Sequence, residues 1–254
     1  MAINVDTVYK TVLLILNKEQ RGYITPDEFN KTATQVQLDI FEQYFDDLNQ
    51  QLRVPQTDYD YADRQMRIDE KISPFKTEGN CVYNSGKFNL PSTDAEGNSV
   101  IYNGTEPTTG QVAFYRLGTV VYSPSIGFPT EIQMLQRNDF YNIEKSPLTA
   151  STKEFPTFLY ENNKLIIRPV TITSSISASF LRKPKNVKWS YLIGNLGQYI
   201  YDNSPNSQNF ELHASEQTEV ITRILLYSGV IIRDPQIVQV AASEIQKNEI
   251  NQKS

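Results

Sequence analysis

The residues best suited to bind a metal ion lie between two apolar segments early in the chain. Six of them fall at positions 1, 3, 5, 6, 8 and 12 of a calcium-binding EF-hand loop: Asn17, Glu19, Arg21, Gly22, Ile24 and Glu28. A neutral amide opens this loop, and Arg21 places a cation where the ion needs an oxygen ligand. The same stretch also fits a helix start, with Thr25 as the N-cap, Pro26 at the first helical position and Glu28 completing a capping box. The mismatches favour a capped helix–loop–helix, and we assign no metal ligand.

One histidine, His213, is the candidate for proton transfer near neutral pH. It lies close to Glu211, Ser215 and Glu216, so a Ser–His or Glu–His pair can be drawn. No glycine elbow surrounds Ser215, and no third residue has the spacing of a catalytic triad. We therefore interpret His213 as a residue at a helix entry and expect no catalytic residue here.

Other catalytic and cofactor motifs are also weak or missing. Acidic pairs at Asp46–Asp47 and Asp58/Asp60 could supply the two carboxylates of a glycoside hydrolase, but acidic pairs on a helix are usually solvated. The sequence has neither a phosphate-binding Gly-Lys-Ser/Thr loop nor a dinucleotide-binding glycine pattern. Its single cysteine, Cys81, excludes an internal disulfide and a cysteine-based zinc site. We expect neither an enzyme nor a cofactor-binding protein.

Charge is unevenly distributed along the 254 residues, whose net charge is −5. Residues 37–72 contain nine acids and four bases and account for a net −5 by themselves. This window is either a solvated helix face or a surface that repels polyanions or meets a basic neighbour. Four cations cluster further on: Arg182, Lys183, Lys185 and Lys188. They could contact nucleic acid, but in an acidic chain a solvated strand end or an acidic neighbour is the preferred interpretation.

Apolar periodicity predicts helices at both ends of the chain. Val8, Val12, Ile15 and Leu16 form one stripe, and a helix from Pro26 carries apolar residues on two sides. One of its stripes is Phe29, Ala33, Val36, Ile40, Tyr44 and Leu48; the other is Leu38, Phe41 and Phe45. A short helix is expected over 58–72, and two more after Ser215 and Asp234.

The middle of the chain has the pattern of β structure. Glycines separate short β-branched and aromatic runs from residue 75 on, and expected strands cover 87–90, 99–102, 112–117, 119–122, 131–135, 158–160, 164–169 and 172–180. Asn162 and Asn163 predict a tight hairpin turn, and 191–208 reads as a loop-rich return.

These patterns predict an α+β fold in which the N- and C-terminal segments form a helical bundle and an antiparallel β domain is inserted between them. The expected divisions are 1–74, 75–209 and 210–254. A long apolar run and a charged-then-apolar leader are both missing, so we expect neither membrane insertion nor secretion.

Several stretches resemble the head-to-tail connector ring proteins of short-tailed bacteriophages, in particular crAss-like phages. They are Met1–Tyr9, Leu16–Asn30 (LNKEQRGYITPDEFN), Phe180–Pro184 (FLRKP) near Trp189, Phe210–Gln217 (FELHASEQ) and Gly229–Pro235 (GVIIRDP). The resemblance implies an adaptor or tail-stabilisation ring of twelve copies, located under the portal in the virion neck and assembled in the host cytoplasm. It implies a DNA channel that retains and releases the genome without sequence-specific binding, and portal and tail proteins as partners.

Two features of the residues agree with such a ring. Helices that are apolar on two sides need neighbours, which ring subunits supply through heterologous interfaces. An acidic window over Asp39–Glu70 would let DNA slide through a lumen, since a phosphate grip would oppose ejection. A carbohydrate-binding tail module and a peptidoglycan hydrolase remain the alternatives.

Overall fold

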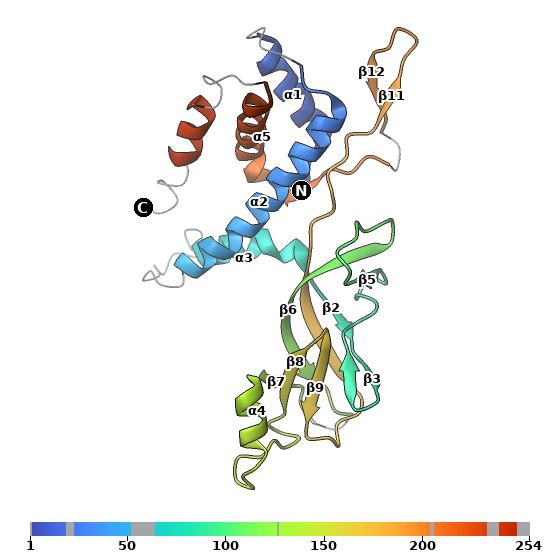
Figure 1. Ribbon diagram of the computed structural model, residues 1–254, viewed down its shortest axis with the longest axis vertical. Coiled ribbons are helices and arrows are strands. Elements are labelled where there is room, and N and C mark those ends of the chain that lie inside the picture. The colour runs from blue at the N-terminus through green and yellow to red at the C-terminus, as the bar shows by residue number, and fades with distance from the viewer. Residues whose placement is uncertain are drawn as a thin grey trace. The chain divides into compact units, whose positions relative to one another are not determined.

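The structure is a computed structural model that describes residues 2–18, 23–51, 64–125, 127–203, 206–232 and 239–247 (Figure 1). The chain forms two compact units. Unit 1 comprises Met1–Pro74 and Pro184–Ser254, and unit 2 comprises Phe75–Lys183. The sequence placed the second division at 209/210, whereas the observed division falls at 183/184.

The helices of unit 1 share one apolar core. Helix α5 packs against both α1 and α2, and Val12, Ile40 and Ile224 are all buried. Val5 and Tyr9 extend the buried stripe of α1, while Ile15, expected inside, is exposed. The bounds are α1 Val5–Lys18, α2 Pro26–Gln51, α3 Arg64–Ile72 and α5 Gln217–Ile232, and residues 239–247 are also helical.

Helix α2 begins with the capping box that the sequence predicts. The Thr25 N–H donates to Glu28 Oε2 at 2.9 Å, and the Glu28 N–H donates to Thr25 Oγ1 at 3.3 Å. Each residue thus satisfies an amide that the first helical turn leaves unpaired. The expected stripe from Phe29 to Tyr44 is buried.

Unit 1 also contains strands that the sequence did not predict. Strand β1 (Ala2–Ile3) pairs antiparallel with β13 (Phe210–His213), which joins the start of the chain to a segment more than 200 residues later. Strands β11 (Tyr191–Ile193) and β12 (Tyr199–Tyr201) form a separate two-stranded sheet. Residues 191–208 are therefore more regular than the loop that was expected.

Unit 2 is built on a nine-stranded mixed sheet that curls into a nearly closed barrel. Its strand order is β2-β10-β6-β7-β8-β9-β4-β3, with β5 beside β6. The two ends of this order, β2 and β3, are consecutive in the chain and separated only by Cys81, whose N–H donates to the Ile176 carbonyl at 2.9 Å. The bounds are β2 Lys76–Asn80, β3 Val82–Asn84, β4 Lys87–Asn89, β5 Ser99–Ile101, β6 Gln111–Tyr122, β7 Thr130–Met134, α4 Arg137–Ile143, β8 Thr157–Glu161, β9 Lys164–Arg168 and β10 Ile176–Arg182.

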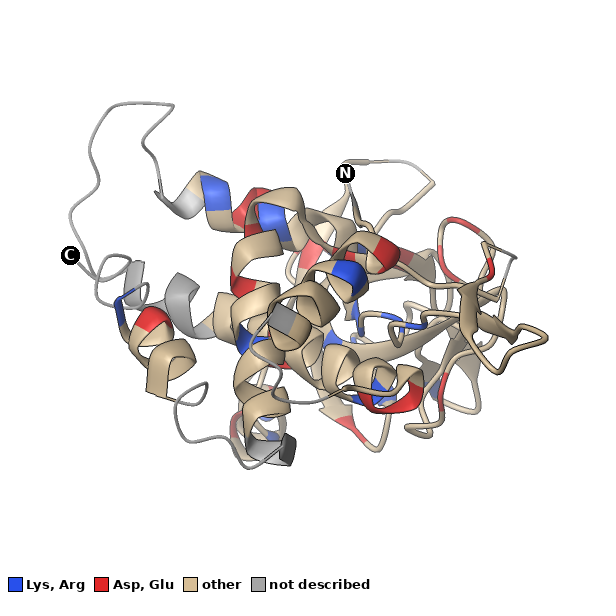
Figure 2. Cartoon of the chain, turned by 90° about the horizontal axis from the view of Figure 1, so that it is seen from above, with Lys and Arg blue, Asp and Glu red and all other residues tan. Residues whose placement is uncertain are grey.

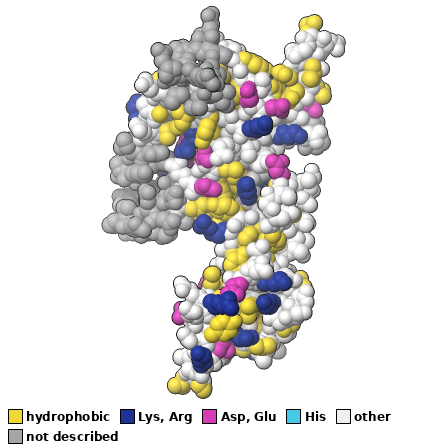
Figure 3. Space-filling model, viewed as in Figure 1, with side chains coloured by type: hydrophobic (Ala, Val, Ile, Leu, Met, Phe, Trp, Pro, Cys, Tyr) yellow, Lys and Arg dark blue, Asp and Glu magenta, His cyan; other side chains and the backbone are white. Residues whose placement is uncertain are grey.

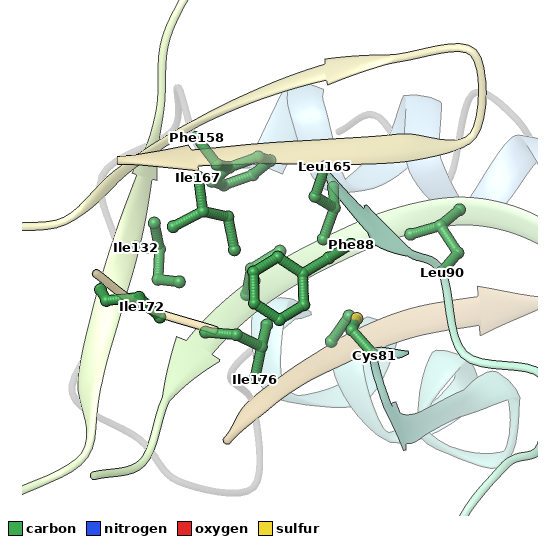
Figure 4. Packing of buried hydrophobic residues seen from close by; sticks show 11 residues of the cluster. Cys81, Phe88, Leu90, Ile132, Phe158, Leu165, Ile167, Ile172 and Ile176 are labelled. Carbon is green, nitrogen blue, oxygen red and sulfur yellow. The ribbon is translucent and has the colours of Figure 1, made fainter. Parts of the chain in front are cut away.

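The barrel interior is filled by side chains from several strands (Figure 4). Phe88, Leu165 and Ile176 are almost fully buried there. The β8–β9 hairpin contributes Phe158 and Ile167, and its turn places Asn162 and Asn163 at φ of 52° and 55°, as predicted. The interior is a packed core of unit 2.

Gly118 lies within one long strand and does not separate two. The expected strands 112–117 and 119–122 are both part of β6. Its pairing with β10 shifts register between Ala178 and Phe180, and Ser179 Oγ accepts the Thr119 N–H at 2.8 Å. A Cβ on Gly118 would lie 2.8 Å from Ser179 Oγ. The glycine therefore marks a β-bulge with close backbone approach.

The expected fold class is wrong. The dominant element is the mixed, nearly barrel-shaped sheet, accompanied by short helices, and it is not an antiparallel domain inserted in a helical bundle. Strands β5 and β6, and β7 and β8, pair in parallel. Alternating apolar residues do not reveal strand direction, and α4 supplies the crossover between β7 and β8 that a parallel pair needs. In unit 1, part of α2 is covered by extended chain and not by another helix.

Candidate interaction surface

A polar stripe on α2 holds the extended chain that follows Pro184. Asn30 Oδ1 accepts the Trp189 N–H at 2.7 Å, and its Nδ2 donates to the Trp189 carbonyl at 3.2 Å. Thr34 Oγ1 accepts the Val187 N–H at 3.1 Å. Gln37, which is fully buried, donates to the Lys185 carbonyl at 2.7 Å. These side chains form the backbone hydrogen bonds that a neighbouring strand would otherwise form with the extended segment.

Helix and strand geometry explain why this pairing works. Asn30, Thr34 and Gln37 are four and three residues apart, which corresponds to about 4.5–6 Å along a helix. Their partners, every second residue from 185 to 189, lie about 6.6 Å apart along an extended chain. The two repeats nearly match, so one helix face can bind successive backbone groups. Gln37 Oε1 also accepts the Glu211 N–H at 2.9 Å, which ties β13 to the same helix.

Trp189 anchors the end of this segment. Its indole is 3% exposed, and its Nε1 donates to Asp6 Oδ1 at 3.1 Å. The Tyr9 ring centroid lies 4.4 Å from that of Trp189, and Tyr191 and Tyr201 stack on it at 5.9 and 5.6 Å. The base of the β11–β12 hairpin is therefore fixed to α1 through aromatic contacts.

Beyond this anchor, the chain forms an exposed apolar hairpin, residues 191–201, which we call the 191–201 hairpin. Its register pairs Leu192 with Ile200 on one face and Ile193 with Tyr199 on the other. Leu192 is 60% exposed, Ile193 70% and Ile200 49%. Figure 3 shows hydrophobic side chains in the region of this hairpin, at the upper right of the view. No charged residue occurs from Trp189 to Tyr201.

The hairpin turn holds its tip residue outward. The Gly194 N–H donates to the Gln198 carbonyl at 2.8 Å, and the Gly197 N–H donates to the Gly194 carbonyl at 2.9 Å. The Gln198 side chain accepts the Leu196 N–H at 3.0 Å. Leu196 itself is 92% exposed. The turn thus presents a leucine to solvent in a defined backbone conformation.

An open pocket of about 660 Å³ lies at the base of the hairpin. Its wall is largely aromatic, and its volume falls in the range of ligand-binding pockets. The lining residues are Tyr9, Lys10 and Leu13 of α1, Tyr23, Trp189, and residues 197–201. We call this the Tyr23 pocket.

The Lys10 ammonium and the Tyr9 hydroxyl of the Tyr23 pocket have partners within the chain. Lys10 Nζ lies 2.7 Å from Asp6 Oδ2, the carboxylate whose other oxygen accepts from Trp189. Burial, together with the neighbouring Tyr23 hydroxyl, raises the pKa of the Tyr9 phenol, which therefore stays neutral at physiological pH. The pocket consequently favours an uncharged, apolar occupant.

His213 is a capping residue, as the sequence indicates. It is exposed and forms the N-cap of the short 3₁₀ turn Ala214–Glu216, where its Nδ1 accepts the Ser215 N–H at 3.3 Å. Ser215 Oγ lies 2.9 Å from the same nitrogen. The Ser–His contact is thus part of a local cap, and the Tyr23 pocket does not include it.

Two carboxylates of unit 1, the buried Glu216 and the half-buried Glu219, are paired with cations. Lys71 contacts Glu216, and Arg223 Nη2 lies 2.6 Å from Glu219 Oε1. Arg223 also donates to Gln43. Burial raises the pKa of Glu219, which Arg223 opposes. Neither carboxylate lines the Tyr23 pocket, so this cluster ties α2, α3 and α5 together and does not face a substrate site there.

The metal-like loop and the acidic window lie only partly within the described residues. Residues 19–22 of the EF-hand-like loop lie outside the described residues. Glu28 forms the capping box with Thr25. In the window, Asp39 accepts from Tyr227 at 2.8 Å, while Glu42 and Glu70 are exposed. The side chains of Asp46, Asp47, Asp58, Asp60 and Asp63 lie outside the described part. Figure 2 shows acidic and basic positions interspersed along the described helices.

The four basic residues of the expected cluster belong to different units. Arg182 lies over the Phe75 ring at 5.4 Å, within unit 2. In unit 1, the Lys185 N–H donates to Glu211 Oε2 at 2.9 Å, and Lys188 forms a backbone bridge with Gln208. Three of the four are half-buried, and the structure gives them local contacts.

Two patterns in the sequence correspond to this surface. Tyr-Leu-Ile and Tyr-Ile-Tyr flank a Gly194–Gln198 stretch containing two glycines, which is a hairpin pattern. Asn30, Thr34 and Gln37 also form a polar stripe beside the apolar one. In the structure, Trp189 connects the two patterns, because its backbone binds Asn30 on α2 and its ring stacks with Tyr191 and Tyr201 of the hairpin. The sequence alone does not show this connection.

Among the described residues, no group of three or more His, Cys, Asp or Glu side chains is arranged to hold a metal ion. None of the helices in the described ranges is long and apolar enough to cross a membrane. Comparison with known protein families gives no match, and comparison with curated proteins gives no relative.

Proposed function

We propose that this chain is a structural virion protein that forms a homo-oligomeric ring in the neck of a short-tailed bacteriophage, between portal and tail. The observation that carries this proposal is the 191–201 hairpin, which exposes large apolar side chains on both faces. Exposed apolar surface of this kind is typical of protein–protein contact sites. The phage neck as the location rests on the sequence resemblance, and the exposed apolar surface supports a contact between subunits.

The charge of the chain supports a passive DNA channel. With a net charge of −5, the protein as a whole is poorly suited to grip phosphates. Glu42, Asp69 and Glu70 are exposed and could face a lumen without binding DNA. Reversing these three charges should slow genome ejection or weaken retention in particles. Unchanged retention and unchanged ring assembly would remove the acidic window from the channel.

A carbohydrate-binding tail component is the second candidate, because the Tyr23 pocket has an aromatic wall. Sugar rings bind to exposed aromatic faces, but Trp189 is almost fully buried and stacked between tyrosines. Among the described aromatic residues that line the pocket, only Tyr23 and Tyr199 are exposed. Calorimetric titration with peptidoglycan fragments and capsular oligosaccharides distinguishes the candidates, and we expect no saturable heat.

Imaging of the purified protein, alone and mixed with portal rings, tests the proposed function. We expect closed rings with a central opening wide enough for duplex DNA, formed alone or on the portal. Particles of single-chain size under both conditions would reject the ring.

A further inference from the structure

The 191–201 hairpin has surfaces that a single copy leaves uncovered. Leu192 and Ile200 form one exposed apolar pair, and Ile193 and Leu196 are exposed beside them. Among the described residues, β11 and β12 pair only with each other, so both outer edges lack a neighbouring strand. Isolated two-stranded hairpins are marginal in water. This hairpin is fixed at its base by Trp189 and at its turn by Gln198, so its exposed conformation is preorganised.

A lipid surface is a poor partner for this element. Hydrocarbon cannot satisfy the free N–H and C=O groups along two open strand edges. The hairpin also carries no lysine or arginine from Trp189 to Tyr201 that could bind anionic headgroups. A protein surface can cover the apolar side chains and pair with the edges.

The same chain provides a matching receptor. The Tyr23 pocket is lined mainly by aromatic and aliphatic groups, and its one cation, Lys10, is paired with Asp6. An uncharged leucine tip suits this neutral pocket, whereas a charged segment would lose hydration there. Leu196 does not line its own pocket and is 92% exposed, so within one copy the leucine tip leaves this pocket unfilled.

We propose that the Leu196 tip of one copy enters the Tyr23 pocket of the next copy. This inference rests on the proposed ring function and deepens it by naming the subunit contact. Leu196 and the pocket are different parts of the surface, so the contact can repeat in one direction from copy to copy, as a heterologous contact does. A reciprocal two-fold pair would instead stop at a dimer in the double cysteine variant. Repetition of a heterologous contact produces a closed ring when the rotation between copies closes. The occupied pocket is itself walled by residues 197–201, so each hairpin contacts its neighbour's hairpin as well as α1.

Site-directed cross-linking tests this contact. Leu196→Cys protein is mixed with Tyr23→Cys protein under mild oxidation, and covalent dimers are separated by denaturing electrophoresis. The only native cysteine, Cys81, is buried, and burial raises the pKa of its thiol to about 12, so its background reaction is low. We expect a mixed dimer, and a ladder of larger products from the double variant. Leu148→Cys, at a position 97% exposed on unit 2, is the matched control and should cross-link to Tyr23→Cys at least tenfold less.

Three results would overturn the contact. One is that the Leu148→Cys control cross-links as well as Leu196→Cys. Another is that self-dimers of Leu196→Cys are as abundant as the mixed dimer. The last is that the wild-type chain floats with phosphatidylcholine–phosphatidylglycerol vesicles and that Leu196→Asp abolishes this flotation. The first shows non-specific collision, the second a symmetric hairpin pair, and the third a membrane partner.

Placing a charge at Leu196 distinguishes a failure of the proposed contact from a failure of the proposed ring function. Leu196→Asp should weaken assembly at least tenfold while leaving the thermal unfolding midpoint unchanged, and Leu148→Asp should alter neither. If wild-type rings form and Leu196→Asp assembles equally well, the contact is wrong and the ring stands. If the wild-type chain never assembles, alone or on a portal, both are wrong.

Discussion

At the scale of single residues, the side-chain amide of Gln37 connects three segments of unit 1: α2, the extended chain at Lys185, and β13. Its amide donates to the Lys185 carbonyl and accepts the Glu211 N–H, from a position with no solvent exposure. Gln37→Ala leaves both backbone groups without these partners, and we expect a loss of about 1–3 kcal/mol in the free energy of unfolding. Urea unfolding followed by the fluorescence of Trp189, the single tryptophan, measures it. Gln35→Ala, at an exposed position two residues away, should cost less than about 0.5 kcal/mol. Equal losses would show that Gln37 is not a specific link.

Glu28 gives unit 1 a pH dependence of known sign. The Thr25 N–H is the main cause of the lowered pKa of the Glu28 carboxyl. A carboxyl with a lowered folded-state pKa stabilises above its unfolded pKa, about 4.3, and loses that stabilisation as the pH falls through the folded value. Glu28→Gln can keep a capping-box hydrogen bond but removes the charge, so it should cost about 0.3–1 kcal/mol at pH 7, and the gap to wild type should narrow below pH ~4. Unfolding at pH 7 and pH 3 checks this. The exposed Glu42→Gln serves as control, and a gap that widens in acid would contradict the capping box.

Residue-level features that depend on neighbours in sequence could be predicted. The capping box at Thr25 and the Asn162–Asn163 turn need only a few consecutive residues, and both are confirmed. The roles of Asn30 and Trp189 could not be predicted, because the two residues meet across 159 positions of chain.

At the scale of elements, strand β2 illustrates a steric requirement inside the barrel. A Cβ on Gly79 would collide with the Thr93 carbonyl and lie 2.6 Å from Pro91 Cβ. Gly79→Ala should therefore destabilise unit 2 by about 1–3 kcal/mol through overpacking. The rate at which a thiol reagent labels Cys81 reports this, since the buried thiol reacts when the barrel opens. Glu78→Ala, exposed on the same strand, is the control.

The effect of Gly79→Ala should be confined to its own unit. The Trp189 unfolding midpoint should stay unchanged, because Trp189 belongs to unit 1. A parallel shift of the Trp189 and Cys81 signals would show that the two units unfold together. Faster labelling in Glu78→Ala than in Gly79→Ala would contradict the steric argument.

Element type was easier to predict than element pairing. The helices of unit 1 and most strands of unit 2 follow local periodicity, as the buried stripe of α2 shows. Pairings such as Ala2 with His213 join residues more than 200 positions apart in the sequence, and no local pattern encodes them. The parallel pairs β5–β6 and β7–β8 were missed for the same reason, and this made the expected fold class wrong. Gly118 was wrongly interpreted as the end of a strand, because glycine occurs both at β-bulges and at strand ends.

At the scale of the whole molecule, unit 2 should fold by itself. Its two ends lie together, since Lys76 and Leu181 are register partners in β2 and β10. Its core also comes entirely from its own residues. Excised residues 75–183 should therefore unfold cooperatively on heating and protect Cys81 from labelling. Immediate labelling of Cys81 without denaturant would show that unit 2 needs unit 1.

The mass of the assembled protein is the most direct test of the central claim, that identical copies join into a ring through surfaces which one copy leaves exposed. Native mass spectrometry of the full chain, alone and with portal rings, provides the measurement. The account predicts a closed assembly of many copies in at least one condition, about 350 kDa if twelve copies of the 29.1 kDa chain assemble. A single-chain mass of 29.1 kDa in both conditions, across the accessible concentrations, would contradict it.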